Sequence, residues 1–137
     1  MKILFVAGFG PIVRDVAASR AFYGDALGLA FEAEVGEYAY TERLDGVKHM
    51  GLWPLSLAAE ACFGHPVWPS DVPVPQATIE FDVGSVEEVA QAAAELQEKG
   101  HRLVHGARTE PWNQTTARLL SPEGLLVGIA YTPGHHA

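Results

Sequence analysis

Apolar and polar positions along the chain follow two different periods, and the same order of periods occurs twice. In the first half, an apolar stretch near 3–9 predicts a strand, and apolar positions at helical spacing between Asp15 and Gly28 predict a helix. Asp15 can accept hydrogen bonds at the start of this helix, and Gly28 can end it. Three short strands are expected next, near 29–34, 37–43 and 47–53.

The second half repeats this plan. The alternating stretch ATIEFDV from about residue 76 predicts a strand, and Ser85 is a good N-cap for a helix that Gly100 ends. Three strands are again expected, near 102–109, 115–120 and 125–131. We therefore predict one domain over 1–137, with two matching modules at about 3–54 and 76–133. The proline-rich segment at about 55–75 is interpreted as a connecting arm with one short helix.

Composition limits the possible partners. The 137 residues contain 9 basic and 17 acidic side chains, a formal charge of −8, without a run of Lys or Arg. This balance argues against nucleic acid and anionic membranes; it favours cationic ligands or serves only solubility. The apolar N-terminal stretch is broken by Gly-Phe-Gly-Pro, which indicates a buried strand rather than a signal peptide or membrane span. The single cysteine, Cys62, excludes an internal disulfide and fits a cytoplasmic protein.

Two segments, RDVAASRAFYGDALGL and PWNQTTARLLSPEGLLVGIAY, resemble the vicinal-oxygen-chelate superfamily, which includes glyoxalase I, ring-cleaving dioxygenases and bleomycin-resistance proteins. The resemblance covers residues 3–133. It implies an α+β fold in which two βαβββ modules form a half-open eight-stranded cup with helices outside. It also implies pairing as a homodimer.

The resemblance implies a metal ligand on each of four strands, at positions that correspond here to Gly8, His49, Thr78 and Gly128. Glycine has no side chain to donate, and threonine is a poor ligand beside one imidazole. Because a catalytic divalent ion normally needs about three protein ligands, we expect neither a metal nor another cofactor. An enzyme is correspondingly less expected than a binding protein.

Strand alternation predicts which residues share a face with these four positions. The residues expected in the cup are Val6, Val47, Gly51, Trp53, Glu80, Leu126 and Ala130. Their neighbours are apolar and should face the helices: Phe5, Ala7, Ile79, Phe81, Leu125, Val127, Ile129 and Tyr131. The small side chains in the cup predict room for a bulky, non-covalent ligand.

Polar and aromatic candidates complete the predicted site. His49 is either a hydrogen-bond partner of the ligand or a core histidine, and Glu80 faces water, pairs with Arg118 or meets a cationic ligand. Three tryptophans, Trp53, Trp68 and Trp112, fall outside the expected helices and suit stacking on a flat ligand. Other histidines are expected to be exposed: His101 and His105 at the ends of a strand, and His135 and His136 in a solvated tail.

These observations predict a non-catalytic protein that binds an antibiotic or aromatic natural product and confers resistance by sequestration. We expect the dimer's cups to be closed partly by the partner's arm. One alternative is a metal-dependent lyase, isomerase or dioxygenase of the superfamily with non-standard ligands. Another is a metal-free enzyme with His49 or Glu80 as its general base.

Overall fold

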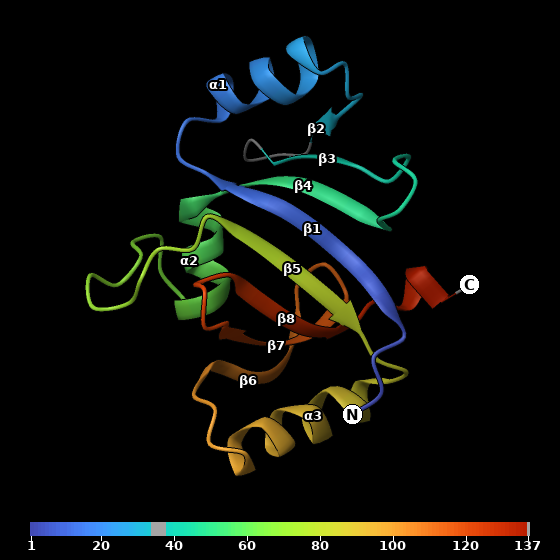
Figure 1. Ribbon diagram of the computed structural model, residues 1–137, viewed down its shortest axis with the longest axis vertical. Coiled ribbons are helices and arrows are strands. Elements are labelled where there is room, and N and C mark those ends of the chain that lie inside the picture. Colours follow the sequence, from blue (N-terminus) through green and yellow to red (C-terminus); the bar gives the residue numbers. More distant parts are fainter. Residues whose placement is uncertain (34–37, 137) are drawn as a thin grey trace.

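The computed structural model describes residues 1–33 and 38–136, and its centre is one open, eight-stranded mixed sheet (Figure 1). The strands are β1 (Phe5–Val13), β2 (Glu32–Ala33), β3 (Ala39–Thr41), β4 (His49–Pro54), β5 (Ala77–Asp82), β6 (Leu103–Glu110), β7 (Gln114–Leu120) and β8 (Leu126–Tyr131). The helices are α1 (Val16–Arg20), a π-helical continuation η1 (Ala21–Ala26), α2 (Leu55–Phe63), α3 (Val86–Glu98) and a 3-10 turn η2 (Pro133–His136). None of the helices in the described chain is long and apolar enough to cross a membrane.

The strand order β2-β3-β4-β1-β5-β8-β7-β6 shows the duplication directly. In each half the first strand pairs in parallel with the last one, β1 with β4 and β5 with β8. The halves join through the antiparallel pair β1–β5, and α1 and α3 lie at the two ends of the assembly (Figure 1). The predicted α+β architecture of two βαβββ modules is confirmed, and the sheet does not close.

The predicted helix start and stop residues are also confirmed. The Ala18 N–H donates to Asp15 Oδ1 at 3.0 Å, and the Glu88 N–H donates to Ser85 Oγ at 3.2 Å. Gly28 and Gly100 have φ of +79° and +90°, the left-handed conformation that ends a helix.

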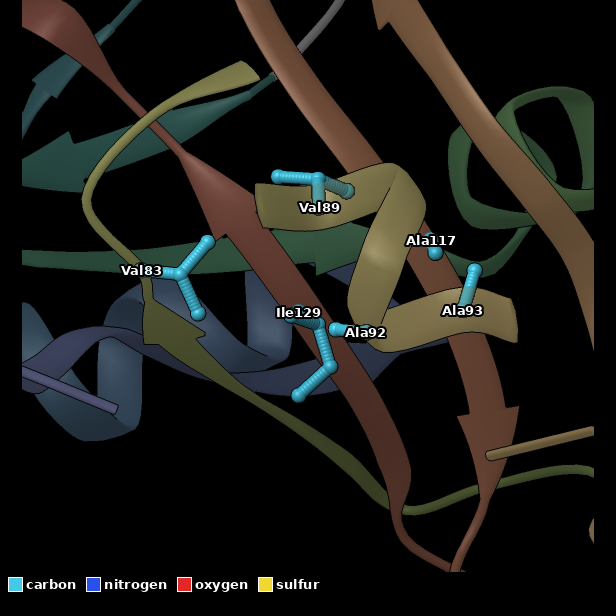
Figure 2. Close-up of a cluster of buried hydrophobic side chains, with 6 residues drawn as sticks. All are labelled: Val83, Val89, Ala92, Ala93, Ala117 and Ile129. Atoms are coloured by element: carbon cyan, nitrogen blue, oxygen red, sulfur yellow. The ribbon is translucent and has the colours of Figure 1, made fainter. Parts of the chain in front are cut away.

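Helix α3 packs closely on its half of the sheet. Figure 2 shows its Val89, Ala92 and Ala93 over Ala117 of β7 and Ile129 of β8, with Val83 at the edge. Phe81 and Tyr131 pack against the same cluster, as the strand alternation predicts. The alanines allow the helix backbone to approach the strands, so this module has a dense core.

The first helix is packed less well than its apolar positions predict. Phe22 is 55% exposed and Leu27 is 57% exposed, while Val16 and Tyr23 pack against Val13, Ala39 and Leu52. The Leu27 N–H bonds the Phe22 carbonyl five residues back at 3.0 Å. This wider π turn moves later side chains off the α-helical period, so not all of the apolar positions that predict the helix reach the core.

A β-bulge in β1 corrects two predicted orientations. Val6 pairs with Phe81 and Gly8 with Glu80, so the register shifts between them and Ala7 is the extra residue. Phe5 consequently pairs with Asp82 and lies on the same face as Glu80, the cup face, while Val6 lies on the opposite face. The predictions for Phe5 and Val6 were wrong because simple alternation carries no information about a bulge.

The arm forms the predicted short helix, α2, and packs on the cup face of its own chain. Ala58, Ala59 and Cys62 of α2 form a buried cluster with Trp68 and Leu126. Trp53, Ile12 and Leu120 pack against this cluster. The arm thus covers one end of the cup face of its own chain.

Candidate functional site

A single cross-strand row runs over the cup face through six strands. Paired residues on neighbouring strands lie side by side and point to the same face. The row, in spatial order, is His49, Gly8, Glu80, Gly128, Arg118 and His105. Five of these six residues are among the predicted site residues, so the sheet brings them together.

The Glu80 side chain occupies the space beside both glycines of this row. A Cβ atom at Gly8 would lie 3.1 Å from Glu80 Oε1, and one at Gly128 would lie 3.1 Å from Glu80 Cγ. These distances are shorter than ordinary van der Waals contact. The room that the glycines leave is therefore filled, next to the strands, by the protein's own carboxylate.

Glu80 is held by a short chain of hydrogen bonds that reaches the surface. Gln114 Nε2 donates to Glu80 Oε1 at 3.0 Å, and the Trp112 indole N–H donates to Gln114 Oε1 at 2.8 Å. Gln114 Nε2 also donates to Thr132 Oγ1 at 2.9 Å. Trp112 is 54% exposed, whereas the Glu80 side chain is 17% exposed. The carboxylate is thus held near the cup surface by Gln114, which also bonds an accessible indole.

Arg118, which follows Gly128 in the row, is fully buried. Its Nη1 donates to Glu110 Oε1 at 2.8 Å, and its guanidinium carbon lies 5.3 Å from the centre of the Trp53 ring. Its Nη2 lies 3.8 Å from Glu80 Oε2, and neither Nη2 nor Nε has a hydrogen-bond partner within the described residues. Arg118 is therefore anchored by Glu110, while its side toward Glu80 retains unused donors.

The buried charges shift the pKa values of their neighbours. Burial alone would raise the pKa of Glu110, but the Arg118 charge and hydrogen bond, with smaller contributions from Thr116 and Arg108, hold it below its usual range. Burial lowers the pKa of His105 to about 4, assisted by the positive charges of Arg118 and Arg108. His105 Nε2 lies 3.0 Å from Arg118 Nη1, so a neutral imidazole can accept this hydrogen bond. The predicted exposed position of His105 is wrong.

The opposite end of the row is aromatic. His49 Nε2 lies 2.5 Å from Tyr38 Oη, and His49 Nδ1 lies 3.2 Å from Glu42 Oε2. The rings of Tyr38, Tyr40 and His49 are nearly parallel, with centroids 5.2–5.9 Å apart. A Cβ at Gly51 would lie 2.6 Å from Tyr38 Cζ, so Gly51 makes room for this ring.

The C-terminal turn is docked, in contrast to the predicted solvated tail. His136 Nε2 lies 2.9 Å from Oδ2 of the fully buried Asp82, and its ring packs on Phe5 and Tyr131. His135 Nε2 lies 3.5 Å from Glu42 Oε2. The turn η2 thereby connects the two modules beside the aromatic end of the row.

Two predicted site residues outside the row bond to backbone carbonyls of the protein itself. Trp68 is 8% exposed, donates to the Val72 carbonyl at 3.0 Å, and packs with α2. Thr78 is buried, and its hydroxyl donates to the Leu126 carbonyl at 3.0 Å. Trp53, by contrast, lies beside Arg118.

Several residues of the site were missed from the sequence. Strand alternation back from Arg118 could have found Gln114 and Thr116 on β7. Finding Glu42, Glu110 and Tyr38 required knowledge of which strands pair, because their partners are distant in sequence or across a turn.

The residues at the superfamily's four ligand positions do not form a metal site. Gly8 and Gly128 offer no side chain and are blocked by Glu80, while the Thr78 hydroxyl is bonded to the backbone. Both nitrogens of His49 have partners. Among the described residues, no group of three or more His, Cys, Asp or Glu side chains could hold a metal ion.

Two surface cavities lie outside the row. The larger, of about 420 Å³, lies along α1 and η1 and is lined by residues that include Arg20, Asp25 and Phe31. The smaller, of about 270 Å³, lies between the N-terminus and α3. Neither cavity coincides with the row. We take the row as the stronger candidate for the functional site because several polar side chains converge there.

Comparison with known proteins identifies one superfamily through its family model. The model of the "Glyoxalase/Bleomycin resistance protein/Dioxygenase superfamily" matches residues 8–129. A comparison with curated proteins found no match.

Solved structures share the fold at low sequence identity. A Vibrio splendidus 12B01 member of that superfamily is 19% identical, with TM-score 0.56, over 95% of this chain and 99% of the other. A variant of Streptomyces coelicolor methylmalonyl-CoA epimerase in complex with 2-nitronate-propionyl-CoA is 19% identical, with TM-score 0.59, over 96% and 99%. A Legionella pneumophila protein described as an NAD-dependent benzaldehyde dehydrogenase is 17% identical, with TM-score 0.61, over 91% and 97%.

Proposed function

The chain belongs to the glyoxalase/bleomycin resistance protein/dioxygenase superfamily, and from this premise we propose that it binds a cationic aromatic small molecule in its cup without transforming it. The observation that carries the proposal is the Glu80 carboxylate, which lies at the centre of the row between Gly8 and Gly128. Binding at this position would sequester the ligand, and resistance to an antibiotic of this chemistry would be the biological result.

Charge and shape around Glu80 support a cationic ligand. Glu80 is partly exposed, and its nearest guanidinium nitrogen is 3.8 Å away, so no short hydrogen bond from Arg118 satisfies it. The net charge of −8 favours the approach of cations. The Trp112 indole is linked to the carboxylate through Gln114, and an exposed indole can stack on a flat cation.

The side chains also support a function without metal. The central position holds a carboxylate fixed by Gln114, and its neighbours in the row are two glycines. One imidazole, engaged at both nitrogens, falls short of the three protein ligands usual for a catalytic ion.

One observation favours a second function, a metal-free enzyme with Glu80 as general base. A carboxylate can remove a proton as a general base. The neighbouring guanidinium, which has unused donors, can stabilise the negative charge that develops. An epimerase among the structures of similar fold is compatible with such chemistry, although that likeness concerns the fold alone. Turnover of a ligand found by binding would distinguish this function from sequestration.

Binding is tested with pairs of flat aromatic compounds that differ only in carrying an amine or a neutral methyl group. We expect the cationic member of a pair to raise the melting temperature and to bind with measurable heat. Glu80→Gln should weaken binding of the cationic compound at least tenfold, about 1.4 kcal/mol, and leave the affinity for the neutral compound unchanged. Glu98→Gln, at an exposed position of α3, is the control with the same charge change.

Equal loss for both compounds, or no loss in Glu80→Gln, would contradict the proposed site. Elemental analysis belongs to the same experiment: near-stoichiometric Zn, Ni, Fe or Mn that survives dialysis would contradict the metal-free proposal. We expect chelators to leave the melting temperature unchanged.

The assembly state is proposed separately. An open eight-stranded sheet has two edge strands, β2 and β6, and such edges are commonly covered by another copy. We expect a homodimer in the cytoplasm. Light scattering at micromolar concentration tests the dimer, and a monomer there would contradict it.

A further inference from the structure

Tyr38, His49 and Glu42 form a hydrogen-bonded chain on the cup face. Tyr38 Oη lies 2.5 Å from His49 Nε2, and His49 Nδ1 lies 3.2 Å from Glu42 Oε2. A hydroxyl, an imidazole and a carboxylate in this order have the connectivity of a nucleophile, its base and the group that orients the base.

The direction of each hydrogen bond follows from the carboxylate. Burial alone would raise the pKa of Glu42, but the hydrogen bond and charge of His49, followed by those of His135, hold it below its usual range. An ionised Glu42 can only accept, so the proton of this hydrogen bond is on His49 Nδ1, and in the tautomer with its proton there Nε2 is an acceptor. The Tyr38 hydroxyl therefore donates to Nε2, the nitrogen that can take its proton.

The backbone is shaped to hold this arrangement. A Cβ at Gly51 would lie 2.6 Å from Tyr38 Cζ and 2.7 Å from Cε1, so only glycine leaves room for the ring. Tyr40 stacks on His49 at 5.2 Å with an interplanar angle of 12°, which restricts rotation of the imidazole. His49 remains 29% exposed and Tyr38 is half-buried, so the chain of hydrogen bonds is close to solvent.

We propose that Tyr38 is a nucleophile, activated by His49 and oriented through Glu42, and that it accepts an acyl group from an aryl ester. The Tyr38 proton passes to His49 Nε2 while the phenolic oxygen forms a bond to the acyl carbon. The bond from that carbon to the leaving phenolate breaks, and the phenolate takes the proton from His49. An aryl leaving group suits the stacked rings of Tyr38, Tyr40 and His49. This activity is additional to sequestration and does not depend on it.

The probe is para-nitrophenyl acetate, mixed with the full-length protein. We expect a burst of nitrophenolate equal to the protein concentration, and peptide mass spectrometry should find one acetyl group on Tyr38. Tyr38→Phe should abolish the burst. The matched control is Tyr23→Phe, since Tyr23 packs behind the sheet against the first helix's core and should leave the burst unchanged.

The role of the base is tested with His49→Gln, which preserves a polar side chain but cannot take the proton. We expect acetylation of Tyr38 to slow about a hundredfold. Glu42→Gln, a second variant at a half-exposed position, should slow it about tenfold. Circular dichroism and melting curves establish that each variant is folded.

Acetylation of Tyr38 at the parental rate in folded His49→Gln would overturn the proposal. Absence of a burst, or acetyl groups found on lysines or His49 instead of Tyr38, would overturn it as well. If His49→Gln does not fold, an unchanged rate in Glu42→Gln is the overturning result. None of these outcomes bears on the binding of cations at Glu80.

Discussion

Glu110, and not Glu80, is the principal partner of Arg118. The Arg118 Nη1 to Glu110 Oε1 distance is 2.8 Å, whereas the Arg118 Nη2 to Glu80 Oε2 distance is 3.8 Å. Glu110 is 5% exposed at its side chain and Arg118 is fully buried, so the pair forms a buried charge network with Thr116. Glu80 is consequently left with the hydrogen bond from Gln114 and a partly exposed carboxylate.

Arg118→Met should be strongly destabilising because it removes the closer cation of the buried Glu110 carboxylate and leaves only the 3.5 Å contact with Arg108. The expected loss in the free energy of unfolding is about 3–5 kcal/mol, measured by urea denaturation. The double variant Arg118→Met, Glu110→Leu removes both charges and should recover a large part of this loss. A double variant no more stable than the single one would contradict the buried pair as the cause.

Gly128→Glu should weaken ligand binding and also destabilise the fold. A Cβ at this position already approaches Glu80 Cγ to 3.1 Å, and the new carboxylate would repel that of Glu80. We expect a tenfold or greater loss of affinity and roughly 1–3 kcal/mol of destabilisation. Calorimetry and thermal melts measure the two effects. A folded variant with parental affinity would show that the ligand does not occupy this part of the cup.

Gly51→Ala should lower the melting temperature because its methyl group overlaps the Tyr38 ring. Overpacking of this kind costs about 1–3 kcal/mol. In a Tyr38→Ala background the three nearest atoms, all of the Tyr38 side chain, are removed, and the same substitution should cost much less. Equal costs in the two backgrounds would locate the effect of Gly51 in its backbone rather than in its contact with Tyr38.

Stability should fall as pH decreases from about 6.5 to about 4, because of His105. Its pKa is lowered from 6.5 to about 4 in the folded protein, so in this interval the unfolded chain binds a proton that the folded chain does not. His105→Gln should flatten the dependence of unfolding free energy on pH in this window. Glu110, whose pKa is depressed, adds a further loss of stability at lower pH, as it is protonated. NMR titration of the imidazole measures the pKa directly, and an ordinary value would contradict the burial of His105.

The fold could be predicted further than the site. The caps Asp15 and Ser85 and the stop residues Gly28 and Gly100 are local signals, so both helices were located from the sequence. The bulge at Ala7 and the π turn in η1 depend on pairing and packing with other elements, and the predicted faces of Phe5, Val6, Phe22 and Leu27 failed there.

Predicting the site required knowledge of which strands are neighbours. Alternation placed Glu80 and Arg118 in the cup, yet their partners Gln114 and Glu110 lie 34 and 8 residues away in sequence. Gly8 and Gly128 were interpreted as leaving space for a ligand. The sequence pattern does not show that the Glu80 side chain, on a neighbouring strand, fills this space. His135 and His136 were misjudged for the same reason, since Glu42 and Asp82 contact them only through the folded sheet.

The two ends of the row differ in chemistry, although the backbone of the sheet consists of two repeated modules. One end carries the stacked rings of Tyr38, Tyr40 and His49, and the other carries the buried cation of Arg118, with an anion between them. The two halves of the sheet are related in topology but not in chemistry. The two ends of an elongated guest lying along this row would therefore meet different side chains, so its two orientations would differ in free energy.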